Sequence, residues 1–151
     1  TRCCVTAGYT ENYLASAPAA LEHGVFIGAA DEGKIASATR ADYAAAAARV
    51  ISEDGHAGKT YELAGDAGWT LSQLAAELAK QSGKKVVYQN LSEADFAAAL
   101  KGVGLPAGLA DMLADSDTGA SKGGLFDDSH TLSNLIGRPT TSLADSVKGI
   151  V

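Results

Sequence analysis

The stretch KTYELAGDAGWTLSQLAAELAKQSGKKVVYQNLSEADFAAAL, residues 59–100, decides the fold class of this 151-residue chain. A β-prone run at residues 60–64 ends in a glycine-rich turn. Thr70 then stands at a helix N-cap position, and Gln73 completes a capping box, in which each side chain bonds the other residue's backbone N–H. Gly83 ends this helix, because glycine readily adopts the left-handed conformation of a C-cap.

The helix after Thr70 has one apolar face at helical spacing. This face consists of Leu71, Leu74, Ala75 and Leu78. A second β-prone run covers residues 86–89, and Ser92 can cap a further helix. The order is therefore strand, helix, strand, helix, and we expect each helix to cover one face of a sheet, as in α/β proteins.

Composition and charge restrict the class of protein. Apolar residues make up 46% of the chain and charged residues 20%, which is typical of a globular domain. The net charge is −6, and 12 Lys and Arg are too few to form a nucleic-acid-binding face without acidic neighbours. No apolar run is long enough to span a membrane, and no signal-peptide pattern is present, so we expect a cytoplasmic protein.

Upstream of residue 59 the pattern predicts a divided helix and a pair of strands. Residues 10–21 form a helix that Thr10 caps and Pro18 divides. Residues 25–29 form a strand, and a polar turn leads into a second β-prone run at 35–38, so the two runs can pair as a hairpin.

Three more helices have clear end signals. Thr39 and Asp42 open a helix over residues 40–53, which is rich in alanine and has high helix propensity. A short helix ends at Gly137, and the last helix begins at Ser142.

The segment between residues 105 and 124 has a weaker pattern. Leucines at helical spacing predict a helix near residues 105–113, with Met112 in the core. Residues 115–124 are polar and rich in glycine, so we expect a mobile surface loop.

Four quoted segments together resemble a known family: YELAGDAGWTLSQLAAEL (61–78), TRADYAAAAARVI (39–51), GGLFDDS (123–129) and LIGRPTTSLADSV (135–147). They resemble the C-terminal half of the NmrA-like group of atypical short-chain dehydrogenases, and within it the bacterial NAD(P)H:quinone oxidoreductases. The resemblance runs from Gly8 to the C-terminus.

The resemblance implies an α/β chain that is the C-terminal part of a Rossmann-type, NmrA-like fold, with short strands and a mostly helical substrate-side subdomain. It places the glycine-rich dinucleotide motif, which residues 1–151 lack, ahead of this chain. The implied reaction of the complete parent is hydride transfer from NADPH or NADH to a small-molecule quinone, and this part alone is expected to be inactive. Two other functions remain open: a redox sensor or regulator that binds the dinucleotide without turnover, and a sugar-nucleotide epimerase or reductase.

The resemblance also indicates residues that approach the cofactor and the substrate. Gly8, Tyr9 and Asn12 match the loop beside the nicotinamide, where glycine permits close backbone approach and Asn offers both a donor and an acceptor. The Tyr9 ring can stack on a flat quinone, and Phe126 can form an apolar lid over it. The alternatives are that Tyr9 packs at a helix entry and that Phe126 anchors its loop. We identify no catalytic acid from the sequence.

We expect no metal site. Asp127, Asp128 and His130 are close in sequence, but this spacing is a weak signal for metal binding. Asp128 or Ser129 more simply caps the next helix.

Residues 1–7 (TRCCVTA) differ from the family pattern, which reads approximately LRNGWY at this point. One choice of codons for residues 1–8, read from the third base, encodes Ala-Leu-Leu-Arg-Asn-Gly-Trp. We therefore hypothesise that residues 1–7 result from translating the DNA of the family segment in a shifted reading frame. In that case Cys3 and Cys4 have no function.

Without the remaining strands of the parent fold, two apolar helix faces would be exposed. These faces lie within residues 44–50 and 71–78. Large exposed apolar patches are rare on monomeric proteins. We therefore expect a homo-oligomer, aggregation or a companion segment.

Overall fold

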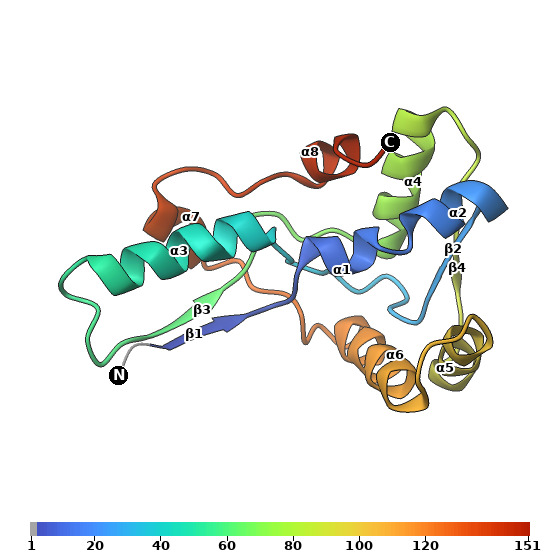
Figure 1. Cartoon of the computed structure of the whole chain (residues 1–151), viewed down its shortest axis with the longest axis horizontal. Helices are drawn as coiled ribbons and strands as arrows, with labels where there is room; N and C mark the ends of the chain where they lie inside the picture. Colours follow the sequence, from blue (N-terminus) through green and yellow to red (C-terminus); the bar gives the residue numbers. More distant parts are fainter. Residues whose placement is uncertain (1–2) are drawn as a thin grey trace.

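The computed structural model describes residues 3–151, which form four strands and eight helices (Figure 1). The strands are β1 (Cys3–Thr6), β2 (Val25–Gly28), β3 (Thr60–Leu63) and β4 (Val87–Asn90). The longer helices are α3 (Arg40–Ser52), α4 (Leu71–Ser82), α5 (Glu93–Gly102) and α6 (Ala107–Ser121). The shorter helices are α1 (Thr10–Leu14), α2 (Ala17–His23), α7 (Thr131–Ile136) and α8 (Leu143–Lys148). None of the described helices has the length and apolar character needed to cross a bilayer.

The strands pair in two separate parallel sheets of two strands each. β1 pairs with β3, with Cys3 opposite Thr60, and β2 pairs with β4, with Val25 opposite Val87. The two strands that flank α4 in sequence therefore lie in different sheets, which Figure 1 shows well apart. α4 packs on the β2–β4 sheet, whereas α5 packs mainly against α6.

The expected hairpin between β2 and residues 35–38 is wrong. Ile35 instead forms an antiparallel bridge with Trp69, and Ala38 forms a parallel bridge with Tyr9. Ile35 and Trp69 exchange both backbone hydrogen bonds, at 2.8 and 3.0 Å. The polar turn after β2 predicted a change of chain direction correctly, but turn residues do not determine which strand pairs with β2.

α4 begins and ends as its sequence predicts. Thr70 Oγ1 accepts a hydrogen bond from the Gln73 N–H at 3.2 Å, and Gln73 Oε1 accepts one from the Thr70 N–H at 2.9 Å, so the capping box is confirmed. Gly83 closes the helix at φ 70°. The apolar face is at most 1% exposed and consists of Leu71, Leu74, Ala75 and Leu78. The expected exposed patch within residues 71–78 is therefore wrong, because α2 and α8 cover this face.

α3 also begins at its predicted cap, since Thr39 Oγ1 accepts a hydrogen bond from the Asp42 N–H at 3.2 Å. The alanine-rich helix packs against α7. Ala46 is 0% exposed and Val50 is 2% exposed. The apolar patch that we expected within residues 44–50 is thus covered at these two positions.

The helix expected at residues 10–21 is divided into α1 and α2, and Pro18 lies in the first turn of α2. Thr10 does not cap α1, which is a correction. Tyr9 holds the N-cap position without a side-chain hydrogen bond. The Thr10 hydroxyl is buried and lies 2.8 Å from the Ser37 hydroxyl, so tertiary contact replaces the local cap.

The loop expected at residues 115–124 is wrong for residues 115–121, because α6 continues to Ser121, whereas residues 122–124 form turns. The buried face of α6 consists of Ala110, Ala114, Asp117 and Ala120. Small side chains produce a weak apolar pattern, yet they allow close packing: a Cβ on Gly33 would overlap the backbone of Ala120. Met112, expected in the core, is 59% exposed.

A buried charge joins α3 to the segment before α8. Asp42 is 0% exposed, and its Oδ2 accepts a hydrogen bond from the Thr141 N–H at 2.8 Å. Arg138 Nη2 lies 2.7 Å from Asp42 Oδ1, as an ion pair rather than a well-aligned hydrogen bond. Burial disfavours the charged carboxylate, but the contacts with Thr141, Arg138 and Thr39 outweigh it and lower the pKa of Asp42.

We predict that Asp42→Asn lowers the free energy of unfolding by about 1–3 kcal/mol, because a buried, hydrogen-bonded charge loses its partners. Asn has one acceptor oxygen and one NH₂ group. Its NH₂ group would therefore face another hydrogen-bond donor, at either Thr141 or Arg138. Asp111→Asn is the matched control. Its ion pair with Lys101 is equally short, at 2.7 Å, but the Asp111 side chain is 59% exposed, so the loss should stay below about 1 kcal/mol. Urea unfolding of both variants measures the difference, and equal losses would contradict this account.

Candidate functional site

A cavity of about 140 Å³ lies where the carboxyl end of β1 meets α1, β2, α5 and α6. Ligands of α/β proteins bind at the carboxyl ends of parallel strands. Much of the wall is apolar and includes Phe26, Phe96, Leu100 and Leu113. Protein cavities of about 150 Å³ can hold benzene. The cavity is therefore large enough to take up an aromatic ring.

Gly8, Tyr9 and Asn12 all line this cavity, so the structure brings the three predicted cofactor-side residues together. Their roles stay predictions. Gly8 has φ +124°, a conformation that favours glycine, and the place where a Cβ would stand is open space. The Gly8 carbonyl accepts hydrogen bonds from the Tyr43 hydroxyl at 3.1 Å and the Ala38 N–H at 3.3 Å. The backbone is thus held in place while one side stays open to a flat ring.

Arg40 orients both Tyr9 and Asn12. Its guanidinium carbon lies 5.3 Å from the centroid of the Tyr9 ring, a cation–π contact. Its Nη2 donates a hydrogen bond to Asn12 Oδ1 at 3.2 Å. The Tyr9 ring also meets Tyr43 edge to face at 5.5 Å. Tyr9 therefore packs at the entry of α1, as the alternative interpretation expected, and lines the cavity as well.

Phe126 does not line this cavity. Phe126 is 43% exposed. Its ring lies against Gly68, where a Cβ would stand 2.8 Å from the ring, and the ring centroid lies 5.7 Å from Lys34 Nζ. It borders a second cavity of about 330 Å³ beside β1 and β3, and the neighbouring Leu125 lines both cavities. These contacts resemble those of a loop anchor, and the role of Phe126 as a substrate lid stays a prediction.

Asp117 is a cavity residue that the sequence analysis missed. It is 6% exposed, and its Oδ2 accepts a hydrogen bond from the Ala29 N–H at 2.9 Å. Within the described part of the chain, no hydrogen bond to Oδ1 is found. Asp117 shares the helical spacing of Ala110 and Ala114 on the buried face of α6. An acid on an otherwise apolar helix face was therefore the available signal.

Burial favours the protonated forms of two acids that line this cavity, Asp117 and Tyr13, and of Tyr88, which does not line it. It raises the pKa of Asp117, and the Ala29 hydrogen bond offsets this only in part. Burial, together with the charge of Asp117, raises the pKa of Tyr13. Burial also raises the pKa of Tyr88 to about 12, and its hydroxyl donates to Asn90 Oδ1 at 2.8 Å. The surroundings of the cavity therefore suit an uncharged ligand.

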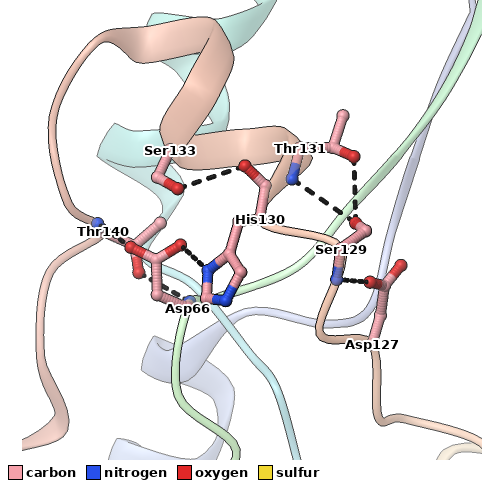
Figure 2. A network of polar contacts seen from close by, with 7 residues as sticks. All are labelled: Asp66, Asp127, Ser129, His130, Thr131, Ser133 and Thr140. Atoms are coloured by element: carbon pink, nitrogen blue, oxygen red, sulfur yellow. Dashed lines mark hydrogen bonds and ion pairs between the residues drawn. The ribbon is translucent and has the colours of Figure 1, made fainter.

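The acids and histidine weighed for a metal site do not converge. Asp127 Oδ1 accepts a hydrogen bond from a backbone N–H in its own loop, whereas His130 Nδ1 lies 2.9 Å from Asp66 Oδ1 (Figure 2). Ser133, His130 and Asp66 do not form a nucleophilic triad either. The Ser133 hydroxyl donates to the His130 backbone carbonyl at 3.1 Å, not to the ring (Figure 2).

The same network ties the loop after β3 to the N-cap of α7 and to the segment that follows α7. Asp66 Oδ2 accepts from the Thr140 N–H, and the Thr140 hydroxyl accepts from the Asp66 N–H, both at 2.9 Å. His130, and not Asp128 or Ser129, holds the N-cap position of α7, at φ 58°. The Ser129 hydroxyl nevertheless accepts a hydrogen bond from the Thr131 N–H at 3.4 Å, so Ser129 bonds the first turn of the helix from outside the N-cap position. Burial disfavours the Asp66 carboxylate, but its hydrogen bonds, including those with His130 and Thr140, lower its pKa.

Comparison with known proteins gives one strong sequence match. No family model matches the chain. Over 139 residues, 92% of its length, the chain is 86% identical to quinone oxidoreductase 2 of Escherichia coli (strain K12), of which the match covers 49%. The chain matches half of a quinone oxidoreductase.

Solved structures agree with this match. The crystal structure of the E. coli NADPH-dependent quinone oxidoreductase complexed with NADPH has a TM-score of 0.93 and 84% identity, over 94% of this chain and 50% of that one. The Citrobacter sp. triphenylmethane reductase complexed with NADP(H) has a TM-score of 0.89 and 35% identity, over 95% of this chain and 50% of that one. The resemblance to NmrA-like reductases and the α/β, Rossmann-type fold class are confirmed. The chain spans about half the length of the curated relatives it matches.

Gly28→Ala should destabilise the protein at the cavity wall. A Cβ there would stand 2.5 Å from Leu71 Cδ1 and 2.9 Å from Asp117 Oδ2. Overpacking of this kind costs about 1–3 kcal/mol of unfolding free energy, measurable by denaturant titration. Gly119→Ala in α6 is the control: its Cβ would meet nothing within 4 Å, and alanine should add about 1 kcal/mol of stability in a helix. Effects of the same sign would argue against the packing described here.

Asp66→Asn should destabilise the protein most at neutral pH. The folded-state pKa of Asp66 is lowered, so its stabilisation is complete above the unfolded-state pKa and is lost as the pH falls through the folded-state pKa. The loss at neutral pH should be about 1–3 kcal/mol. Thermal unfolding of both proteins, from neutral to acidic pH, should show their difference shrinking. A difference independent of pH would rule out the carboxylate as its source.

Proposed function

We propose that this chain forms the substrate side of an NAD(P)H-dependent oxidoreductase that reduces quinones by hydride transfer. The observation that carries this proposal is the 86% identity to a quinone oxidoreductase, sustained over 92% of the chain. We further propose that residues 1–151 belong to the C-terminal part of the enzyme, which works in the cytoplasm without a nucleic-acid partner. A net charge of −6 supports the last point. Homo-oligomerisation stays a prediction.

NADPH or NADH is the cofactor that we infer. The related proteins are described with NADPH and NADP(H). The open space beside Gly8 fits a nicotinamide ring, because a Cβ would fill the place where the ring could approach the backbone. Among the described residues, no turn between a strand and a helix has the G-x-G-x-x-G spacing that holds a pyrophosphate, and the Gly65–Gly68 turn between β3 and α4 lacks it too. We therefore assign these residues to the nicotinamide end alone.

The residues of this chain would bind and orient the reactants. When bound, the nicotinamide supplies the hydride. The apolar wall, with Phe96 and Leu113, excludes water and favours an uncharged, flat acceptor. The Tyr9 ring can stack on that acceptor, and Arg40 holds the Asn12 amide for a polar contact. Holding two rings face to face lowers the entropic barrier to their reaction.

The direct test is an assay of the full-length gene product with NADPH and 1,4-benzoquinone. We expect quinone-dependent loss of NADPH absorbance. Binding of NADPH without oxidation by any quinone would instead support the sensor or regulator function. Conversion of a nucleotide sugar without quinone reduction would support the epimerase alternative.

Tyr9→Ala should raise the KM for benzoquinone about 3- to 10-fold, the loss expected for one aromatic stacking contact. Tyr9→Phe is the matched control, because it keeps the ring face and should leave KM within about twofold of wild type. Steady-state kinetics of both variants measure the effect. Equal KM values for the two variants would exclude Tyr9 as a stacking platform.

A further inference from the structure

Reduction of a quinone to a hydroquinone needs a proton as well as a hydride. We propose that Asp117 donates this proton to a quinone bound in the cavity at the end of β1. The inference rests on the proposed function, because the cavity needs a proton donor only if quinone is reduced there.

The proposed step balances in atoms and charge. The hydride brings two electrons and one hydrogen to the quinone, which becomes a hydroquinone monoanion as NADPH becomes NADP⁺. The O–H bond of the Asp117 carboxyl then breaks as a new O–H bond forms on the hydroquinone oxygen. Neutral hydroquinone leaves, and the carboxylate regains its proton from water. Each turnover consumes one proton from solution.

The two oxygens of Asp117 have different surroundings. Oδ2 accepts a hydrogen bond from the Ala29 N–H at 2.9 Å. It also lies so close to Gly28 that a Cβ on that residue would stand 2.9 Å from it. Among the described residues nothing forms a hydrogen bond with Oδ1. Asp117 lines the same cavity as Tyr9, the predicted platform for the quinone. A proton on Oδ1 is therefore available to a ligand in this cavity rather than committed to the protein.

The surroundings favour Asp117 in its proton-carrying form. The side chain is 6% exposed, and burial raises its pKa. The shift brings the pKa of Asp117 closer to neutral pH. A general acid is most effective when its pKa lies near the pH at which the enzyme works. After the transfer, a carboxylate is left buried beside apolar side chains, which favours its return to the neutral form.

The phenols near the cavity are weaker candidates. Tyr13 also lines the cavity, but burial and the neighbouring Asp117 raise its pKa, which makes it a weaker acid than an ordinary phenol. The Tyr88 hydroxyl already donates to Asn90. Asp117 is therefore the acid best matched to the step.

Asp117→Asn separates the proton from the structural contact. Its amide oxygen can still accept the Ala29 N–H, but the side chain has no acidic proton to transfer. Asp115→Asn is the matched control on the same helix. Asp115 is exposed and does not line the cavity, so its rates should equal those of wild type.

The test compares two acceptors with the full-length protein and NADPH. Tetramethyl-1,4-benzoquinone yields a weakly acidic hydroquinone, whose anion needs a proton donor. Tetrachloro-1,4-benzoquinone yields a stronger acid, whose anion can leave without a proton. Asp117→Asn should lower kcat about 100- to 10,000-fold with the tetramethyl acceptor and far less with the tetrachloro acceptor. Comparing variant with wild type for each acceptor removes the difference in redox potential.

Equal losses with both acceptors would make Asp117 a structural residue, and no loss would exclude it as the donor; either result overturns the proposal. If Asp117→Asn does not fold, wild type in D₂O decides instead. Its kcat should fall with the tetramethyl acceptor and not with the tetrachloro acceptor, and the same response to both would overturn the proposal. If wild type reduces neither quinone, the proposed function fails as well. If wild type reduces quinone and Asp117→Asn is unaffected, Asp117 is excluded as the proton donor, and the proposed function stands.

Discussion

The burial of one face of α4 is the constraint on which the larger core depends. Leu71, Leu74 and Leu78 are each 0% exposed and pack between the β2–β4 sheet, α2 and α8. Full burial of one such side chain contributes about 1.5–3 kcal/mol. Leu71 also lines the cavity and would meet any side chain at Gly28. The packing that holds the core together therefore also shapes the wall of the candidate site.

Two carboxylates secure the part of the chain that covers α4. Asp42 binds the Thr141 backbone, and Asp66 binds the Thr140 backbone. These contacts fix the segment immediately before α8, which lies on α4 (Figure 1). The hydrophobic face and the polar ties depend on each other, because α8 can exclude water from α4 only while the preceding segment is held in place.

The candidate site lies between the segment that follows β1 and one strand of the other sheet, β2. The loop after β1 supplies Gly8 and Tyr9, and β2 supplies Phe26. α6 brings Asp117 to the same cavity and binds the end of β2 through Ala29. The loop after β1 thus contributes an open glycine backbone and an aromatic face, α6 contributes a buried acid, and apolar side chains form much of the surrounding wall. This combination suits a flat, uncharged ring that must be oriented and protonated.

The sequence by itself determined the features whose causes are local. The capping box of Thr70 and Gln73 was enough to predict α4. The amino-acid sequences of the four quoted segments were enough to predict the fold class and the family. The resemblance also pointed to Gly8, Tyr9 and Asn12, which line one cavity. Only the tertiary structure decided the strand pairing, the burial of Asp42 and the place of Asp117. Parallel strands are joined by long connections, so turn signals do not reveal their partners. Asp117 accepts its hydrogen bond from Ala29, which is 88 positions away in the sequence. It lies on a helix whose buried side chains are otherwise small, so the apolar pattern of that helix is weak.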